Sequence, residues 1–95
     1  MTENKALEDA VLLFLEQHDE YNRGIHDVEF VQPFKKANLI ELPKNDFLAE
    51  LIFAHCRLME KRGYILYEIE TSSGKKMIGP VLPAGYERLA EIHKK

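Results

Sequence analysis

The clearest structural signal in this chain is the stretch LMEKRGYILYEIETSSGKKMIGP, residues 58–80. Two basic residues followed by Gly63 are typical of a helix end, because basic side chains favour the negative end of a helix and glycine suits the position beyond it. Residues 64–70 are rich in strand formers, residues 71–74 are typical of a turn, and residues 75–78 return as a strand. The stretch therefore predicts a helix that continues directly into a β-hairpin.

The helix before this hairpin is predicted from about Lys44 to Arg62, with Asn45 as its N-cap. Apolar residues recur along it at helical spacing and cover an arc of roughly 140°. These residues are Phe47, Leu48, Leu51, Ile52, His55, Leu58 and Met59. The opposite face carries Asp46, Ala49, Glu50, Phe53, Arg57, Glu60 and Lys61. The first face is predicted to lie in the core and the second to be exposed.

Two further helices are predicted at the ends of the chain. The first runs from about Glu3 to His18 with Thr2 as its cap, and residues 19–24 form a turn after it. The last begins near Pro83, since proline suits the first helical position. The apolar positions of the first helix are Leu7, Ala10, Val11, Phe14 and Leu15, and those of the last are Tyr86, Leu89, Ala90, Ile92 and His93.

The segment between the first helix and the long one is ambiguous. Residues 25–38 fit either a short helix from about Asp27, ended or broken near Pro33, or a short strand around residues 28–30. We favour the short helix. Residues 39–43 are apolar and precede or include a proline, which favours an extended conformation and a brief strand.

The predicted order is helix, short helix, brief strand, long helix, hairpin and helix. A long helix that feeds a hairpin through a glycine is typical of a winged helix-turn-helix, so the fold class is α+β with a single domain over residues 1–95. About 45% of the residues are hydrophobic, which supports one small core. The chain begins without a signal-peptide pattern and has one cysteine, Cys56, so we expect a cytoplasmic protein that does not enter a membrane.

Two motifs carry a family resemblance. Residues 58–65 resemble the exit from the third helix of many bacterial winged-helix proteins, and residues 79–89 resemble the signature that follows their wing. The Gly79-Pro80 pair is similar to that of the YjcQ family of small Gram-positive and phage-associated proteins. The resemblance implies a winged-helix fold like that of DNA-binding domains. Leu82 stands where the family places a capping threonine, and Pro83 follows it.

Charge is distributed unevenly along the chain. The net charge is −3, which argues mildly against a general nucleic-acid binder. Residues 1–43 hold 4 basic and 9 acidic residues, for a balance of −5, whereas residues 44–95 hold 9 basic and 7 acidic residues, for a balance of +2. A contact with phosphate is therefore expected in the second half.

The first functional hypothesis is a DNA-binding or transcription-regulatory protein of phage or mobile-element type. Arg57 and Lys61 on the long helix, and Lys75 and Lys76 at the hairpin, would contact the phosphates of double-stranded DNA. Residues 44–45, Lys44 and Asn45, would enter the groove. The exposed face of the helix holds more acids than bases, and lysines at a hairpin also protect an edge strand from aggregation.

The second hypothesis is an interaction module that forms a homodimer or binds another protein. Phe53, an aromatic residue on the predicted polar face, has Ala49 and Arg57 as neighbours, a composition typical of an interface centre. The alternative for Phe53 is that it packs under residues 25–42, which have apolar side chains to spare.

Residues that could carry chemistry do not form a recognisable motif. The four histidines have no metal-ligand spacing, and a lone cysteine has no second cysteine to pair with. His55 and Cys56 are adjacent on a helix and point about 100° apart, so they cannot act together as nucleophile and base. His55 is expected to be a structural residue, and we expect no catalytic residue, metal, cofactor or small-molecule substrate.

Overall fold

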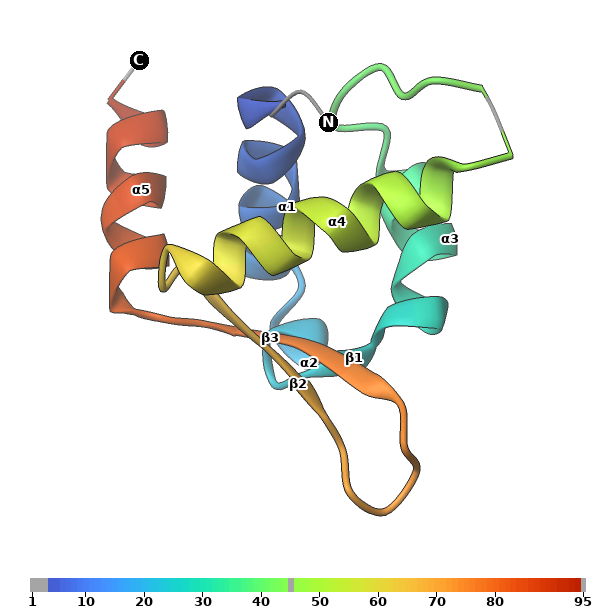
Figure 1. The fold of residues 1–95 in the computed structure, drawn as a ribbon. Coiled ribbons are helices and arrows are strands. Elements are labelled where there is room, and N and C mark those ends of the chain that lie inside the picture. Colours follow the sequence, from blue (N-terminus) through green and yellow to red (C-terminus); the bar gives the residue numbers. More distant parts are fainter. Residues whose placement is uncertain (1–3, 45, 95) are drawn as a thin grey trace.

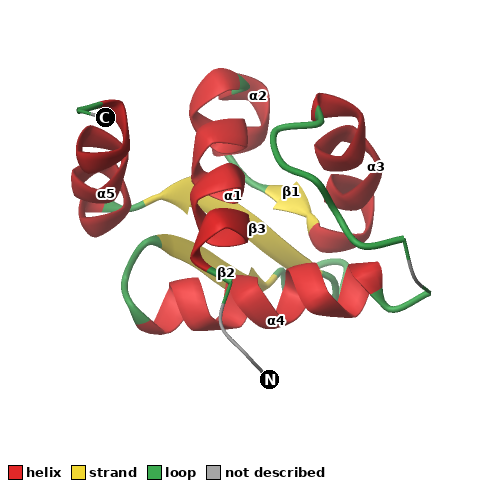
Figure 2. Ribbon diagram, turned by 90° about the horizontal axis from the view of Figure 1, so that it is seen from above, coloured by secondary structure: helices red, strands yellow, loops and turns green. Residues whose placement is uncertain are grey.

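A computed structural model describes residues 4–44 and 46–94 of the chain. The described part is an α+β arrangement of five helices and a three-stranded antiparallel sheet (Figures 1 and 2). The elements are α1 (Lys5–Gln17), α2 (Asp19–Asn22), β1 (Ile25–His26), α3 (Asp27–Ala37), α4 (Leu48–Lys61), β2 (Ile65–Ile69), β3 (Lys76–Val81) and α5 (Pro83–His93). Within these residues, no helix combines the length and apolar character needed to cross a bilayer.

The sheet has the order β1-β3-β2, so β3 is its central strand. The predicted hairpin is confirmed: β2 and β3 pair antiparallel, with Tyr67 opposite Ile78. The strand β1 was not predicted, because two residues are too short for an alternating pattern; Ile25 pairs with Ile78 from the other side. This topology is compatible with a winged-helix-like fold.

Helix α1 supplies a large part of the core, and all five of its predicted apolar positions are buried. The helix begins at Lys5, and its cap is Asn4, whose side chain accepts a hydrogen bond from the backbone N–H of Leu7 at 3.1 Å. Thr2, the predicted cap, lies outside the described residues. The turn predicted after α1 is instead the short helix α2, which begins directly after His18.

Helix α3 continues through Pro33 to Ala37, so the prediction that it ends or breaks at the proline is wrong. The proline removes one N–H from the helix interior. Phe30 and Phe34 offset this loss, because both are buried and their rings stack with centroids 5.1 Å apart. Asn38, in the left-handed conformation, ends the helix.

Residues 39–43 form no strand, contrary to the prediction, and connect α3 to α4 irregularly. Their apolar side chains pack against the core instead of pairing with a sheet. Helix α4 consequently begins at Leu48 and not near Lys44. The predicted cap Asn45 lies outside the described residues, and Phe47 occupies the N-cap position without a side-chain capping bond.

The predicted core face of α4 is largely confirmed. Leu48, Ile52, His55 and Met59 are buried, Leu51 and Leu58 are half-buried, and Cys56 is buried as well. Phe47 is the exception at 71% exposed, because it precedes the first helical turn and its side chain does not follow the helical arc.

Strand β3 runs on through Pro80 to Val81, whereas the sequence predicted that it would stop at Gly79. Proline is tolerated there because β1 pairs only with residues 77–78, so no neighbouring strand on that side needs the missing N–H. The side-chain oxygen of Asn22 then accepts the N–H of Val81 at 2.9 Å.

Helix α5 begins at Pro83 as predicted, and Leu82 at its N-cap makes no side-chain capping bond. Its buried side is narrower than predicted: Leu89 is buried and Ile92 is half-buried, whereas Tyr86, Ala90 and His93 are exposed. Gly85 is also buried, where the helix approaches the backbone of Tyr64.

Candidate nucleic-acid interface

Helix α4 runs along one edge of the molecule, and its outer side meets no other helix (Figure 2). The exposed residues on this helix include Arg57 and Lys61, which are one turn apart, and the acidic residue Glu50. Glu60 is half-buried on the same helix. Among the described residues, neither Arg57 nor Lys61 has an ion-pair partner. The outer side of α4 therefore offers two unpaired basic groups near two carboxylates.

The β2–β3 hairpin projects away from the helices (Figure 1). Its two lysines are not equivalent. Lys75 is exposed and makes no side-chain contact that would neutralise it within the described chain. Lys76 is half-buried, and its Nζ lies over the ring of Tyr67, 4.3 Å from the centroid. This cation–π contact makes Lys76 less available for a phosphate than Lys75.

The hairpin turn is held by its own polar groups. Ser72 donates a hydrogen bond to the carboxylate of Glu70 at 3.0 Å, and the Nε2 atom of His26 lies 3.5 Å from the same carboxylate. Hydrogen bonds from Ser72 and Ser73, together with the neighbouring His26, lower the pKa of Glu70. The turn therefore carries an ionised carboxylate close to Lys75, which weakens its positive potential.

A polar contact joins the hairpin to the start of α3. The hydroxyl of Tyr67 donates a hydrogen bond to Oδ2 of Asp27 at 2.9 Å. Burial, followed by the hydrogen bond and the charge of Asp27, raises the pKa of Tyr67, and the charge of Arg57 opposes this rise. The side chains of Arg57 and Lys76 thus both lie within electrostatic range of the Tyr67 ring, between α4 and the hairpin.

The burial of Phe53, the predicted centre of a protein interface, differs from the prediction. Phe53 is half-buried and packs against the hydrophobic core, so the expectation that it is exposed is wrong. Its neighbour Ala49 is half-buried too. The buried face of α4 is wider than the predicted arc because α1, α3 and β2 all pack on this helix. The alternative in which Phe53 packs inward is the one that the structure supports.

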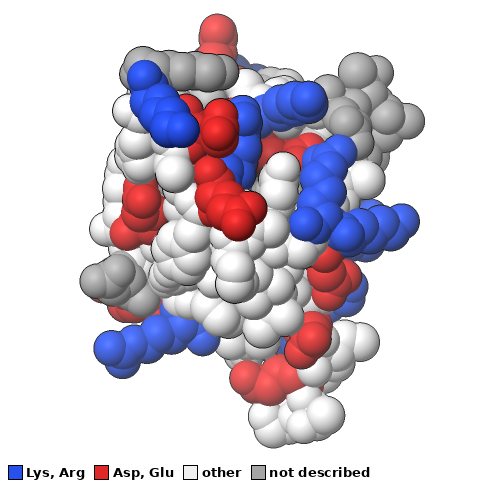
Figure 3. All heavy atoms as spheres, turned by 90° about the vertical axis from the view of Figure 1, so that its left-hand side faces the viewer, with Lys and Arg blue, Asp and Glu red and all other residues white. Residues whose placement is uncertain are grey.

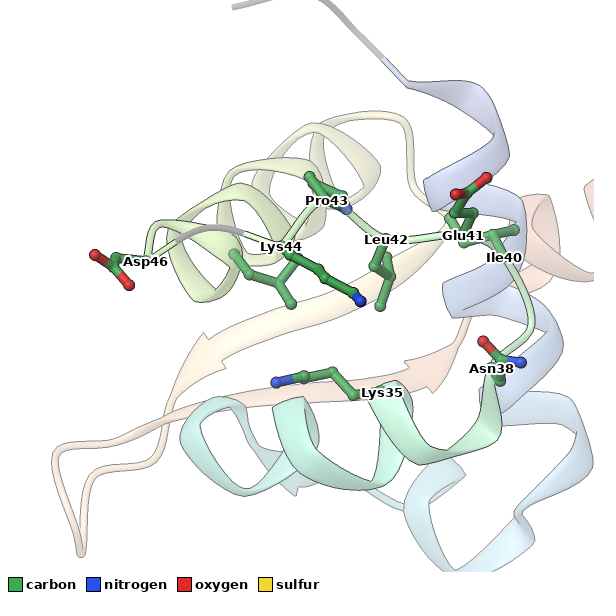
Figure 4. A pocket seen from close by; sticks show the side chains of 9 residues that line it. Lys35, Asn38, Ile40, Glu41, Leu42, Pro43, Lys44 and Asp46 are labelled. Carbon is green, nitrogen blue, oxygen red and sulfur yellow. The ribbon is translucent and has the colours of Figure 1, made fainter.

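The two residues predicted to enter a DNA groove precede α4. Lys44 lies in the irregular α3–α4 connection, and Asn45 is outside the described residues. Lys44 lines a cavity of about 510 Å³ between the end of α3 and the start of α4 (Figure 4). Lys35 of α3 lines it as well, and these two lysines could not be grouped from the sequence, because the connection has no periodic pattern.

The arginines packed against α1 are paired, in contrast to Arg57. Arg88 donates two hydrogen bonds to Asp9, at 2.9 and 2.8 Å, and Arg62 pairs with the buried carboxylate of Glu8. The hydrogen bonds from Arg88 to Asp9, together with the charge of Asp9, raise the pKa of Arg88. On the side of the molecule that bears α5, basic and acidic side chains alternate, so this face has no patch of a single charge (Figure 3).

The side chains that could carry chemistry, His55 and Cys56, are buried and have structural roles. His55 is fully buried, with Nδ1 2.8 Å from the carbonyl oxygen of Leu51 and Nε2 3.0 Å from the backbone nitrogen of Asn4. Burial raises the pKa of the Cys56 thiol to about 12, Asp27 adds to the rise, and Arg57 opposes it. A thiol of this kind is a poor nucleophile. No cluster of three metal-binding side chains occurs in the described ranges.

The chain matches no family model, no curated protein and no solved structure in these comparisons. A function for this chain is therefore inferred from the arrangement of its own side chains.

Proposed function

We propose that this chain is a winged-helix protein that binds double-stranded DNA, with the outer side of α4 in the groove and the β2–β3 hairpin on the adjacent backbone. The observation that carries the proposal is a set of exposed basic side chains on these two elements that have no ion-pair partner among the described residues. These side chains are Arg57, Lys61 and Lys75. Basic side chains that contact phosphates need to be free of competing carboxylates. Arg62 and Arg88 are already paired with carboxylates of the protein.

The order of the elements supports the same proposal. Helices α3 and α4 lie in sequence between the outer strand β1 and the hairpin, as expected for a helix-turn-helix unit followed by a wing. Helix α4 has 14 residues. A helix of that length spans about 21 Å, and its diameter of about 10–12 Å with side chains fits a major groove about 12 Å wide.

The resemblance of residues 58–65 and 79–89 to bacterial winged-helix proteins, and of the Gly79-Pro80 pair to the YjcQ family, agrees with this proposal and favours a regulator of phage or mobile-element type. A DNA-bound role also agrees with a cytoplasmic protein that keeps its one cysteine as a thiol. A dimerisation module centred on Phe53 has less support, because that side chain packs against the core.

The acidic residues of α4 limit the strength of the proposed contact. Glu50 and Glu60 lie on the same helix as Arg57 and Lys61, so the local charges nearly cancel. We therefore expect weak binding to mixed-sequence DNA, and binding that depends on a preferred site to overcome this repulsion.

The experiment is a fluorescence-anisotropy titration of duplex DNA at several salt concentrations. Binding should weaken steeply with salt, and the double variant Arg57→Gln/Lys61→Gln should reduce the slope of log K against log salt by about 2. The matched control is Lys94→Gln, since Lys94 is an exposed lysine at the end of α5. Absence of binding at low salt, or an unchanged slope in the double variant, would refute this mode of binding.

A further inference from the structure

The cavity between α3 and α4 brings together basic and apolar side chains from three segments. Lys35 comes from the last turn of α3, Lys44 from the connection, and Leu48 from the first turn of α4. Its volume of about 510 Å³ lies within the range of about 300–1,000 Å³ typical of sites for small molecules.

Two ammonium groups point into this cavity. In Figure 4 the amino groups of Lys35 and Lys44 are directed into the space between α3 and the connection. Neither lysine has an ion-pair partner within the described residues. The carboxylates of Glu41 and Asp46, which also line the cavity, point away from these amino groups. The repulsion between two like charges would be relieved by an anion between them.

Apolar side chains form another part of the wall. Leu42, Ile40 and Leu48 line the cavity, and all three are buried or half-buried in the structure. These side chains cannot satisfy an inorganic ion, whereas they can cover a hydrocarbon group. The cavity therefore combines an anion-binding side with a surface for an apolar body.

The start of α4 adds to the positive potential at this place. Phe47 provides no side-chain cap, so the first N–H groups of α4 have no side-chain acceptor from the N-cap residue. The N-terminal end of a helix carries a partial positive charge. Because Leu48 belongs to the first turn and lines the cavity, that partial charge has the same sign as the two ammonium groups, although Glu50 in the same turn and Asp46 before it offset part of it.

We propose that this cavity binds a small organic anion with an apolar body, such as an alkyl phosphate or an alkyl carboxylate. The anionic group lies between Lys35 and Lys44, and the apolar body lies on Leu42 and Leu48. This proposal does not depend on DNA binding, because it rests on the lining of the α3–α4 cavity alone.

The test is a titration of the full chain with hexyl phosphate, in which binding is measured from ¹H–¹⁵N NMR spectra. Inorganic phosphate and 1-hexanol serve as probes that carry only the anionic or only the apolar part. We expect hexyl phosphate to shift signals of residues 35–48 and to bind at least about tenfold more tightly than either partial probe, a difference of about 1.4 kcal/mol.

Two variants locate the site. Lys35→Gln/Lys44→Gln should weaken hexyl phosphate binding by about tenfold or more with an unchanged spectrum elsewhere, and Lys94→Gln should bind as the wild type does. Equal binding of hexyl phosphate and inorganic phosphate would mean a simple anion contact and would overturn the proposal. Shifts that map outside residues 35–48, or an unchanged affinity in the double variant, would overturn it as well.

Discussion

The ring of His55 in α4 joins that helix to the start of α1, because its Nε2 atom accepts a hydrogen bond from the backbone N–H of Asn4 at 3.0 Å. The Nδ1 atom faces the carbonyl oxygen of Leu51 at 2.8 Å and therefore donates. The two contacts define one tautomer with the proton on Nδ1. One buried imidazole thus satisfies an N–H group at the beginning of a helix 51 residues away in the sequence.

The variant His55→Leu should destabilise the fold even though leucine fills much of the same volume. It leaves the N–H of Asn4 without its acceptor at a partly buried site, and the loss of such a hydrogen bond costs about 0.5–1.5 kcal/mol. Urea denaturation followed by circular dichroism measures the change. His93→Leu is the control, because the contact of His93 Nε2 with Glu16 at 2.8 Å lies at the exposed surface and should contribute less than about 0.5 kcal/mol. Equal stability of the two variants would show that the Asn4 contact has no energetic role.

Gly85 lies inside α5, where alanine would ordinarily stabilise a helix by about 1 kcal/mol. We predict the opposite for Gly85→Ala. A Cβ atom there would collide with the carbonyl oxygen of Tyr64 and would lie 2.7 Å from Cγ1 of Val81, so the helix would have to move away from the α4–β2 junction. The expected cost is more than about 2 kcal/mol. Thermal denaturation checks this, and Ala90→Gly on the exposed side should cost only about 1 kcal/mol.

The hydrogen bond between Tyr67 and Asp27 should contribute measurably to stability. Tyr67→Phe removes the donor and leaves a carboxylate without it, which should lower the free energy of unfolding by about 1–2 kcal/mol. Tyr64→Phe is a matched control, because the Tyr64 hydroxyl makes no hydrogen bond with another described residue. A similar loss in both variants would contradict a specific contribution from the Tyr67–Asp27 hydrogen bond.

Stability should fall at alkaline pH because of Cys56. Its pKa is raised from 9.0 to about 12 in the folded chain, so the folded state keeps its proton when the unfolded chain has lost it. The contribution is fully present below pH 9 and is lost as the pH rises above that value. The free energy of unfolding should fall by about 1 kcal/mol between pH 9 and pH 10 because of this group.

Urea denaturation at pH 7, 9 and 10 measures this dependence. Cys56→Ala should remove most of the decrease between pH 9 and 10, whereas Tyr67→Phe should keep it, because the pKa of Tyr67 is raised from a higher starting value of 10.0. A pH profile of Cys56→Ala that parallels the wild type would contradict the assignment.

Two phenylalanines in the first half of the α4 region should differ in how much their truncation to alanine changes stability. Phe53 packs against the core, so Phe53→Ala should cost about 1–3 kcal/mol. Phe47 is mostly exposed, so Phe47→Ala should change stability by less than about 0.5 kcal/mol. Denaturation by urea compares them directly, and a larger loss for Phe47→Ala would reverse the assignment of core and surface.

The sequence predicted the elements whose signals are local and periodic. The hairpin and α5 follow from strand formers, turn residues and Pro83, and the core face of α1 follows from its regular apolar spacing. These patterns depend on residues close in sequence, so they survive in the folded protein.

The errors arise where tertiary contacts override local preference. Pro33 remains inside α3 because Phe30 and Phe34 are both buried on either side of it, and a propensity cannot include that energy. Phe53 is half-buried because it packs against the core on a helix that α1, α3 and β2 all contact, and a helical wheel of α4 alone does not contain these neighbours. Arg57, Lys61 and Lys75 were named from the sequence, whereas the pairing of Lys35 with Lys44 across one cavity depends on the path of the irregular connection.

The central position of β3 has a consequence for synthesis on the ribosome. Strand β1 precedes α3 and α4 in the chain, yet its partner β3 ends only at Val81. A growing chain therefore cannot complete its sheet until residue 81 has emerged from the exit tunnel, and α1 cannot pack against α5 before then. Until that moment α1 can pack against α2, α3 and α4 but not against β3 or α5, so part of its apolar side stays exposed in the nascent protein and is open to aggregation.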